Sequence, residues 1–268
     1  IQVGEVNEND EFISLGGGSG VVISAEGLII TNHHVIDGAN SVRAIFEDGR
    51  MYKAEIIGSD QLTDIGLVKI ESNNLIPIAI GNSDILVVGD LAVAIGHPLT
   101  LGAAPTVTTG IVSALERRLD VGGQDMSSSV TLFGLIQTDA PITRGSSGGA
   151  LLNQNGELIG ITTAIATADV GAEGLGFAVP INLALNISQD LLDDGKVYHS
   201  FLGILGAQHF EVADDGARIF SGVEIQELYG PANDIYAIGK AGALPGDIIK
   251  KVNGKNIKTL DGLISLLR

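Results

Sequence analysis

Short apolar runs separated by turn residues fill the first two thirds of the chain. Each run is five or six residues long and rich in Val, Ile, Leu or Ala, and Gly, Asn or Asp residues occupy the intervals between runs. Runs of this length predict β-strands, and their spacing favours a β-barrel or sandwich. The runs are residues 20–24, 27–31, 54–58, 65–70, 91–95, 110–115, 158–163 and 176–180.

After these runs the spacing of the apolar residues changes. Apolar side chains recur over residues 181–192 at the spacing of an amphipathic helix, and an Asp-Asp-Gly sequence at 193–195 predicts its end. We expect one helix there, closing a first domain. Further strands and a terminal amphipathic segment are expected beyond it, in a small mixed domain, at residues 201–205, 223–227, 246–252 and 260–268.

Composition narrows the class of protein. Hydrophobic residues make up 45% of the 268 residues and charged ones 18%, which is too apolar for intrinsic disorder. The absence of cysteine excludes disulfides, cysteine-ligated zinc and thiol catalysis. Fifteen basic against 32 acidic residues give a net charge of −17, which argues against a nucleic-acid partner. Residues 1–198 carry −16 of it (8 − 24) and residues 199–268 only −1 (7 − 8), which favours two separate parts.

A glycine-rich turn, Gly-Ser-Ser-Gly-Gly, occupies residues 145–149. Glycines let a turn hold a hydroxyl out of the chain while successive backbone N–H groups point into one hollow, as an oxyanion hole requires. The alternative is an ordinary Ser/Gly surface loop. The turn by itself leaves both interpretations open.

Other residues supply the context that a serine nucleophile needs. Such a serine requires a histidine to accept its proton and a carboxylate to orient that histidine. His34 lies 30 residues before Asp64, which lies 83 residues before Ser147, and this is the chain order of chymotrypsin-like proteases. Two alternatives stay open for the acid, Asp60 and Asp139. His33 and His34 would point to opposite sides of an extended chain, so only one can face a cleft.

A metal centre is not expected. A His-Glu-x-x-His pair, which places two zinc ligands on one helix face, is absent from the sequence. The Gly-rich segment 16–20 lacks the Lys-Ser/Thr of a phosphate-binding loop. We therefore expect no cofactor.

Eight segments between residues 18 and 180 match one known pattern. They are 18–23 (Gly-Ser-Gly-Val-Val-Ile), 31–36 (Thr-Asn-His-His-Val-Ile), 58–65 (Gly-Ser-Asp-x-x-Thr-Asp-Ile), 89–96 (Gly-Asp-Leu-Ala-Val-Ala-Ile-Gly), 109–114 (Thr-Gly-Ile-Val-Ser-Ala), 137–140 (Gln-Thr-Asp-Ala), 145–151 (Gly-Ser-Ser-Gly-Gly-Ala-Leu) and 174–180 (Gly-Leu-Gly-Phe-Ala-Val-Pro). With these segments the sequence resembles the HtrA (Deg) family of serine proteases. The resemblance implies a mainly β protein, with a chymotrypsin-like double β-barrel over residues 1–197 and a small PDZ-like α+β domain over residues 198–268.

The resemblance also implies roles for single residues. The family pattern Thr-Asn-x-His selects His34 as the general base and makes His33 the variable position. Asp64 then orients His34, Ser147 attacks the peptide carbonyl, and the backbone N–H groups of Gly145 and Ser147 bind the oxyanion. The sequence departs from the pattern where Ser146 precedes the nucleophile instead of Asn. It also has Gly-His-Pro at 96–98 instead of Gly-Asn-Pro.

A substrate pocket is expected beside the nucleophile. In this fold the segment before the serine and a later strand line the pocket, and here they contribute Ile142, Arg144, Thr163 and Ile165. These walls are small or apolar apart from Arg144, which is either a solvent-facing loop residue or part of the activation loop. We expect cleavage after small aliphatic residues such as Val or Ala.

The second domain resembles a PDZ module. Residues Phe201, Leu202, Gly203 and Ile204 correspond to its carboxylate-binding loop and first strand, where a peptide C-terminus adds to the sheet edge. The Gly-Asp-Ile-Ile-Lys-Lys-Val-Asn-Gly segment at 246–254 matches the core strand and turn. The strand expected after Leu267 is missing, so we expect this domain to be incomplete at its C-terminus.

The leading functional hypothesis is an ATP-independent serine endopeptidase of protein quality control, which cleaves unfolded or misfolded proteins in the periplasm. By resemblance it assembles as a homotrimer, with Phe12 and Ile13 as contributors, and a membrane anchor outside this sequence is compatible with that assignment. In a stress-sensor variant, C-terminal peptides bound to the PDZ domain activate the protease. The alternative is a non-enzymatic chaperone or peptide-binding scaffold of the same fold.

Overall fold

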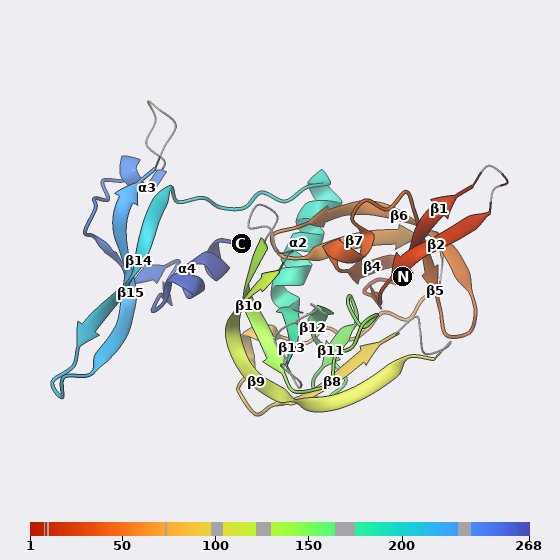
Figure 1. Cartoon of the computed structure of the whole chain (residues 1–268), viewed down its shortest axis with the longest axis horizontal. Coiled ribbons are helices and arrows are strands. Elements are labelled where there is room, and N and C mark those ends of the chain that lie inside the picture. Colours follow the sequence, from red (N-terminus) through yellow and green to blue (C-terminus); the bar gives the residue numbers. More distant parts are fainter. Residues whose placement is uncertain are drawn as a thin grey trace. The chain divides into compact units, whose positions relative to one another are not determined.

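The computed structural model divides into two compact units (Figure 1). Unit 1 is Ile1–Tyr198 and unit 2 is His199–Arg268. The structure describes residues 1–7, 9, 11–72, 74–97, 104–121, 130–163, 175–229 and 237–268. Within these residues no helix is both long and apolar enough to cross a membrane.

Unit 1 begins with a seven-stranded antiparallel sheet. The strands run across the sheet in the order β2 (Phe12–Gly17), β1 (Gln2–Val6), β5 (Ser41–Ile45), β6 (Met51–Asp60), β7 (Ile65–Ile70), β4 (Leu28–Thr31) and β3 (Val21–Val22). Its buried side chains include Ile29, Val68 and Ile70, which form one core cluster. The short helix α1 (His33–Ile36) follows β4, and Val35 and Ile36 anchor it in the same cluster.

The second half of unit 1 is a closed six-stranded barrel. Around the barrel the strands are β10 (Val130–Thr138), β13 (Gly176–Pro180), β12 (Leu158–Thr163), β11 (Ala150–Leu152), β8 (Leu91–Gly96) and β9 (Thr106–Val121), and η1 (Ser83–Ile85) precedes β8. Alternate residues face inward, as Ala92 and Ala94 show by their complete or near-complete burial. The interior also contains Ile136, Leu151 and Ile159.

Unit 1 is mainly β with few helices. The expected pair of closed barrels is only partly present. The barrel of β8–β13 closes, whereas the edge strands β2 and β3 of the first sheet do not pair with each other in the described part of the chain. The β1–β2 hairpin extends this sheet beyond β5, and a β-bulge at Val3/Gly4 marks it as irregular.

One long helix closes unit 1. Helix α2 (Ile181–Asp194) ends at Gly195, whose left-handed conformation (φ 69°) and N–H bond to Leu191 O at 2.9 Å stop it. Its buried residues Ile181, Ala184, Ile187 and Leu191 pack into the core cluster that includes β7 and β12 residues. The helix expected over residues 181–192 is therefore present.

Unit 2 has its own small core. Its sheets are β14 (Ile204–Val212), β15 (Arg218–Leu228) and β16 (Ile248–Ile249), and a separate pair of β17 (Lys251–Val252) and β18 (Lys255–Asn256). Helices α3 (Ala237–Lys240) and α4 (Leu260–Leu267) complete it. Val223, Ile257 and Leu263 form the core centre. The strand expected at 201–205 begins only at Ile204, and the segment at 260–268 is the helix α4.

Candidate active site

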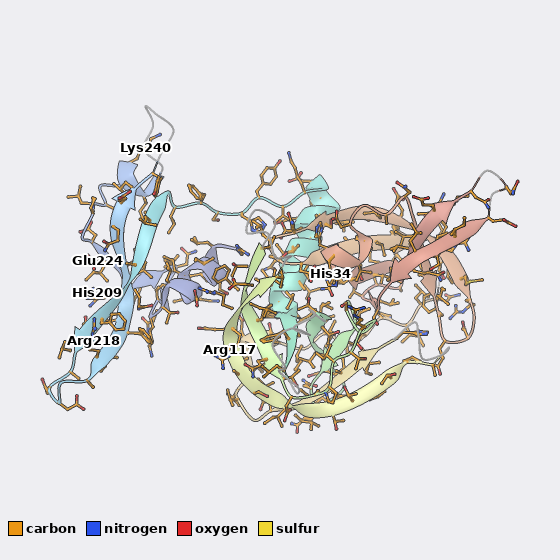
Figure 2. All side chains as sticks on the ribbon, viewed as in Figure 1. His34, Arg117, His209, Arg218, Glu224 and Lys240 are labelled. Carbon is orange, nitrogen blue, oxygen red and sulfur yellow. The ribbon has the colours of Figure 1, made fainter. Side chains whose placement is uncertain are left out.

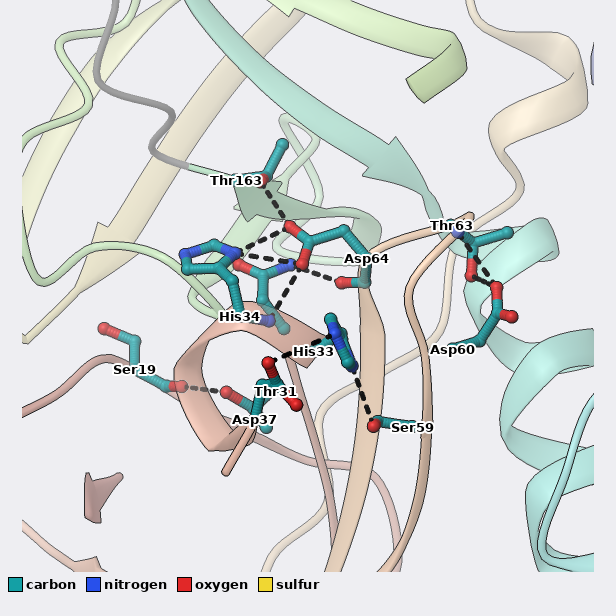
Figure 3. Close-up of polar contacts among 11 residues, drawn as sticks. Ser19, Thr31, His33, His34, Asp37, Ser59, Asp60, Thr63, Asp64 and Thr163 are labelled. Carbon is teal, nitrogen blue, oxygen red and sulfur yellow. Dashed lines mark hydrogen bonds and ion pairs between the residues drawn. The ribbon is translucent and has the colours of Figure 1, made fainter. Parts of the chain in front are cut away.

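The His34 side chain is held by the Asp64 carboxylate (Figure 3). Nδ1 of His34 lies 2.9 Å from each Asp64 carboxylate oxygen, and the backbone N–H of His34 donates to Oδ1 at 3.1 Å. A carboxylate only accepts, so the ring proton is on Nδ1 and the Nε2 lone pair can accept a proton. The His34 side chain is 43% exposed and that of Asp64 only 7%. A buried acid therefore orients a histidine that substrate can reach.

Asp64 adopts a left-handed backbone conformation (φ 57°), which is uncommon for a residue with a side chain.

The two alternative acids, Asp60 and Asp139, make hydrogen bonds elsewhere. Asp60 Oδ2 accepts hydrogen bonds from the N–H and the hydroxyl of Thr63, at 2.9 and 2.5 Å. Asp139 Oδ1 accepts the N–H of Ile111 at 2.7 Å. Both alternative acids thus have structural bonds of their own, and Asp64 is the carboxylate that meets His34.

The adjacent histidine points elsewhere. His33 Nδ1 lies 2.8 Å from Ser59 Oγ, and its Nε2 lies 3.9 Å from Asp37 Oδ2. The expectation of an extended chain at this point is wrong, because both histidines are in the first turn of α1. Successive side chains of a helix diverge by about 100° and not 180°, but the consequence is the same, since His34 alone contacts Asp64.

Three further groups fix Asp64 in place. Thr163 Oγ1 donates to Asp64 Oδ2 at 2.7 Å, and Asn32 Nδ2 and the His33 N–H donate to the Asp64 carbonyl at 2.9 and 3.2 Å. Thr163 was expected in the substrate pocket, but the structure shows its hydroxyl bonded to the acid (Figure 3). Asn32 belongs to the Thr-Asn-x-His motif, but the motif alone does not indicate this contact with Asp64.

The turn that carries Ser147 is tightly bonded to itself and to β12. Ser146 N donates to Thr143 O, and Gly149 N to Ser146 O, at 3.0 and 2.9 Å. Gly145 and Gly148 have φ of 91° and 82°, the left-handed region that glycine tolerates. The Ser147 residue is buried, with 6% exposure.

Strand β12 joins this turn to the acid. Thr162 Oγ1 donates to Ser146 O at 2.6 Å, and Thr162 O accepts the Gly148 N–H at 2.8 Å. The next residue, Thr163, donates to Asp64. Two consecutive threonines thus connect the acid that orients His34 with the turn that carries Ser147, the expected nucleophile (the nucleophile turn), although these elements come from different sheets.

In the described part of the chain, the other predicted pocket residues make no hydrogen bond to the His34–Asp64 pair. Ile142 is half-buried, and a Cβ on Gly176 would lie 2.7 Å from its Cδ1, so it packs closely on β13. Arg144 is exposed, and Ile165 lies outside the described residues. Among the residues that the structure describes, no group of three or more His, Cys, Asp or Glu side chains could hold a metal ion.

The predicted peptide-binding segment of unit 2 lies before the first strand. Gly203 has φ 75°, and its carbonyl accepts the Tyr229 N–H at 2.7 Å. Phe201 is exposed, while Leu202 and Ile204 pack on the small core of unit 2. Strand β14, which starts at Ile204, is at the edge of its sheet.

Comparison with known proteins identifies the family. Residues 18–161 match the family of trypsin-like peptidase domains. The chain is 45% identical over 251 residues to a probable periplasmic serine protease do/HhoA-like from Haemophilus influenzae, covering 91% of this chain and 51% of the relative. It is 45% identical over 257 residues to the periplasmic pH-dependent serine endoprotease DegQ of Escherichia coli, covering 93% and 53%.

Solved structures agree with the sequence relatives. The HtrA-type protease AlgW with a decapeptide matches with a TM-score of 0.70 and 36% identity, covering 95% of this chain and 74% of that one. A serine endoprotease from Yersinia pestis matches with a TM-score of 0.66 and 34% identity, covering 99% and 82%. The chain spans about half the length of the curated relatives it matches. These similarities, together with the His34–Asp64 pair and the glycine turn at Ser147, show that the chain belongs to the HtrA family of trypsin-like serine proteases.

Proposed function

We propose that the protein is a serine endopeptidase in which His34, Asp64 and Ser147 form the catalytic triad. The observation that carries this proposal is the oriented histidine: both oxygens of a buried carboxylate lie 2.9 Å from His34 Nδ1. The Thr162–Thr163 pair of β12 supports the inclusion of Ser147, since it bonds to both the nucleophile turn and the acid. The names of the relatives favour a protease over a non-enzymatic scaffold.

The reaction follows from these assignments. His34 Nε2 takes the Ser147 hydroxyl proton as the serine oxygen attacks the peptide carbonyl. Asp64 stabilises the resulting imidazolium without being protonated itself. His34 then gives the proton to the leaving amine, and water attacks the acyl-enzyme in a second cycle of the same steps.

The oxyanion formed at each step would bind to the N–H groups of Gly145 and Ser147. Within the described part of the chain, the structure records no acceptor for the Gly145 N–H, so this donor is available to a substrate oxygen. Preorganised donors of this kind are usually the largest single contribution to catalysis. Losing one donor typically costs about 100- to 1,000-fold in kcat.

The substrates that we propose are unfolded or misfolded proteins, cleaved without ATP after small aliphatic residues. Support for an apolar pocket comes from Ile142, which is apolar and half-buried, and from Thr163, which carries no charge. Arg144 is exposed to solvent, which supports its interpretation as a loop residue. Ile165, the remaining predicted wall, belongs to this proposal on sequence grounds alone.

Unit 2 is proposed to be a PDZ domain over residues 198–268. Its support is the edge strand β14 preceded by the Phe-Leu-Gly-Ile segment 201–204, where an added peptide would extend the sheet. The related AlgW structures were determined with a decapeptide and with a tripeptide. By analogy, C-terminal peptides of damaged proteins would bind here and activate the protease.

A periplasmic location and a homotrimer complete the proposal. Several relatives are named as periplasmic proteases. Self-association is supported by an exposed apolar surface on the outside of the closed barrel, which we call the β8–β9 apolar face: Leu91, Val107 and Ile111. Ile13 on β2 is also exposed, whereas the ring of Phe12 lies under the Arg43 guanidinium at 4.1 Å.

Casein hydrolysis tests the function. The chain and its Ser147→Ala variant would be assayed on unfolded casein, each with and without a peptide that has an apolar C-terminus, and both would be treated with a fluorophosphonate. We expect cleavage and labelling by the unsubstituted chain alone, and stimulation by the peptide if unit 2 regulates. An unsubstituted chain that neither cleaves casein nor forms the adduct under either condition would refute the assignment.

A further inference from the structure

Ser19 lies where the first sheet meets the nucleophile turn, and it is almost fully buried, with 4% exposure. Its backbone N–H donates to Ser147 O at 2.6 Å, and its hydroxyl donates to Gly145 O at 2.7 Å. The same hydroxyl accepts a hydrogen bond from the His97 N–H at 2.7 Å. The Ser19 backbone carbonyl accepts one from the Thr31 hydroxyl at 2.7 Å (Figure 3). Ser19 therefore bonds to three segments that are remote in sequence.

Three glycines bring the backbone close to Ser19 and to the turn that carries Ser147. A Cβ on Gly18 would lie 2.7 Å from Ser147 O, and one on Gly148 would lie 2.3 Å from Ser19 O. On the other side of the turn, a Cβ on Gly96 would lie 2.7 Å from Ser146 Oγ. A methyl group would therefore have no room at any of these three glycines, and their backbone packs closely against Ser19 and the turn.

The bonds fall on consecutive peptide groups of the turn. In a planar peptide, fixing the carbonyl of one residue fixes the N–H of the next. The carbonyls of Gly145, Ser146 and Ser147 are each bonded, two of them by Ser19 and the middle one by Thr162. The peptide between Gly145 and Ser146, which the Ser19 hydroxyl holds, lies between the two peptides that carry the proposed oxyanion donors.

We propose that Ser19 is a positioning residue that sets the spacing of the Gly145 and Ser147 N–H groups, and so of the oxyanion hole. The inference rests on the proposed protease function. The Ser19 hydroxyl both accepts from His97 at the end of β8 and donates to Gly145, so it connects that strand end to the oxyanion turn. An alanine at this position retains the backbone bond to Ser147 but loses both hydroxyl bonds.

The test compares two serines of similar burial, Ser19 and Ser188. Ser19→Ala, the intermediate variant Ser19→Cys and the control Ser188→Ala would be assayed with saturating activating peptide on a peptide substrate that has Val before the cut. Ser188 is 5% exposed and its hydroxyl donates to Ala184 O at 2.7 Å in α2, away from the turn. Thermal unfolding would be recorded for each variant, so that lost activity is compared among folded proteins.

We expect Ser19→Ala to lower kcat roughly 10- to 100-fold, with KM changed by less than about threefold, because a misplaced donor affects the transition state more than the bound substrate. The rate of fluorophosphonate labelling, which forms a similar tetrahedral centre, should fall in parallel. Ser19→Cys, which keeps a weak donor, should lie between, and Ser188→Ala should keep its kcat.

Two results would overturn the inference. If folded Ser19→Ala keeps the kcat and the labelling rate of an active unsubstituted chain, or if only its KM rises, Ser19 has a packing role alone and the inference is wrong while the protease function stands. If the unsubstituted chain itself neither cleaves nor labels, both the proposed function and this inference fall.

Discussion

At the residue scale, the hydroxyl of Thr163 orients the acid of the proposed triad. It donates to Asp64 Oδ2 at 2.7 Å from a fully buried position in β12. Replacing it by the isosteric valine leaves a buried carboxylate oxygen without this donor, and hydrogen bonds to charged groups contribute about 1.5–3 kcal/mol. We therefore expect Thr163→Val to lower kcat about tenfold or more at nearly unchanged KM, in peptide hydrolysis at neutral pH.

Thr163→Ser is the matched control for this prediction, because it keeps the hydroxyl and loses only a methyl group. Its kcat should stay within about threefold of the unsubstituted chain, since the hydroxyl still donates to the carboxylate. Equal losses of kcat in the valine and serine variants would mean that packing, and not the bond to Asp64, explains the effect.

The sequence could indicate which residue types carry the chemistry, but not all of their partners. His34 and Asp64 were predicted from chain order and motif, and their contact is present in the structure. The roles of Ser147 and Gly145 remain proposals supported by the turn. Thr163 was placed in the pocket wall because a threonine in an apolar strand has no sequence signal for a hydrogen bond to a residue 99 positions away.

At the element scale, the nucleophile turn depends on a glycine in a crowded left-handed position. Gly148 has φ 82°, and a Cβ there would lie 2.3 Å from Ser19 O and 2.4 Å from Thr31 Oγ1. Gly156 has a similar φ of 76°, but a Cβ there meets nothing within 4 Å. Alanine at either position adds about 1 kcal/mol of backbone strain, whereas only Gly148→Ala displaces the turn.

We expect Gly148→Ala to abolish fluorophosphonate labelling and to lower the free energy of unfolding by more than about 2 kcal/mol, as combined strain and overpacking would. Gly156→Ala should lose about 1 kcal/mol and label normally. Urea unfolding and labelling rates measure both effects. Normal labelling of folded Gly148→Ala would contradict this prediction, because it would show that the turn can accommodate a methyl group at Gly148.

The strands that the sequence revealed contain mostly apolar runs of five or six residues. Each of the eight predicted runs overlaps a strand, and α2 follows them as expected. Strands β1, β2, β5, β10 and β11 were not predicted. Several of these mix polar and apolar residues at the surface, and β10 contains Gly134 at φ 71°, so a short window shows no clear alternation. The edges and bends of a sheet depend on tertiary pairing, which local pattern does not encode.

At the scale of the whole molecule, the two units have separate cores. The apolar clusters of unit 1 and the cluster around Val223 in unit 2 share no residue. Charge also differs between these parts of the chain, and this difference was visible in the sequence. In unit 2, Arg218 and His209 lie along the β14–β15 ribbon (Figure 2). The PDZ assignment of this unit stays a proposal.

The β8–β9 apolar face is a second surface, in addition to Ile13 on β2, that we propose for the homotrimer. Leu91 and Ile111 are directly paired across β8 and β9, and Leu91 is 46% exposed although neighbouring Ala92 is fully buried in the barrel. Exposed apolar side chains that gather on one face mark interaction sites, whereas isolated ones are common on any surface. Ile76, which is 91% exposed, provides a control outside this face.

We expect Leu91→Glu to convert the trimer to a monomer in light scattering at micromolar concentration, because a charge in an apolar interface loses hydration without gaining a partner. Ile76→Glu adds the same charge and should leave the mass unchanged. If both variants retain the mass of the unsubstituted chain, the β8–β9 apolar face does not join the subunits. If that mass is already a monomer's, the homotrimer itself is refuted for this chain.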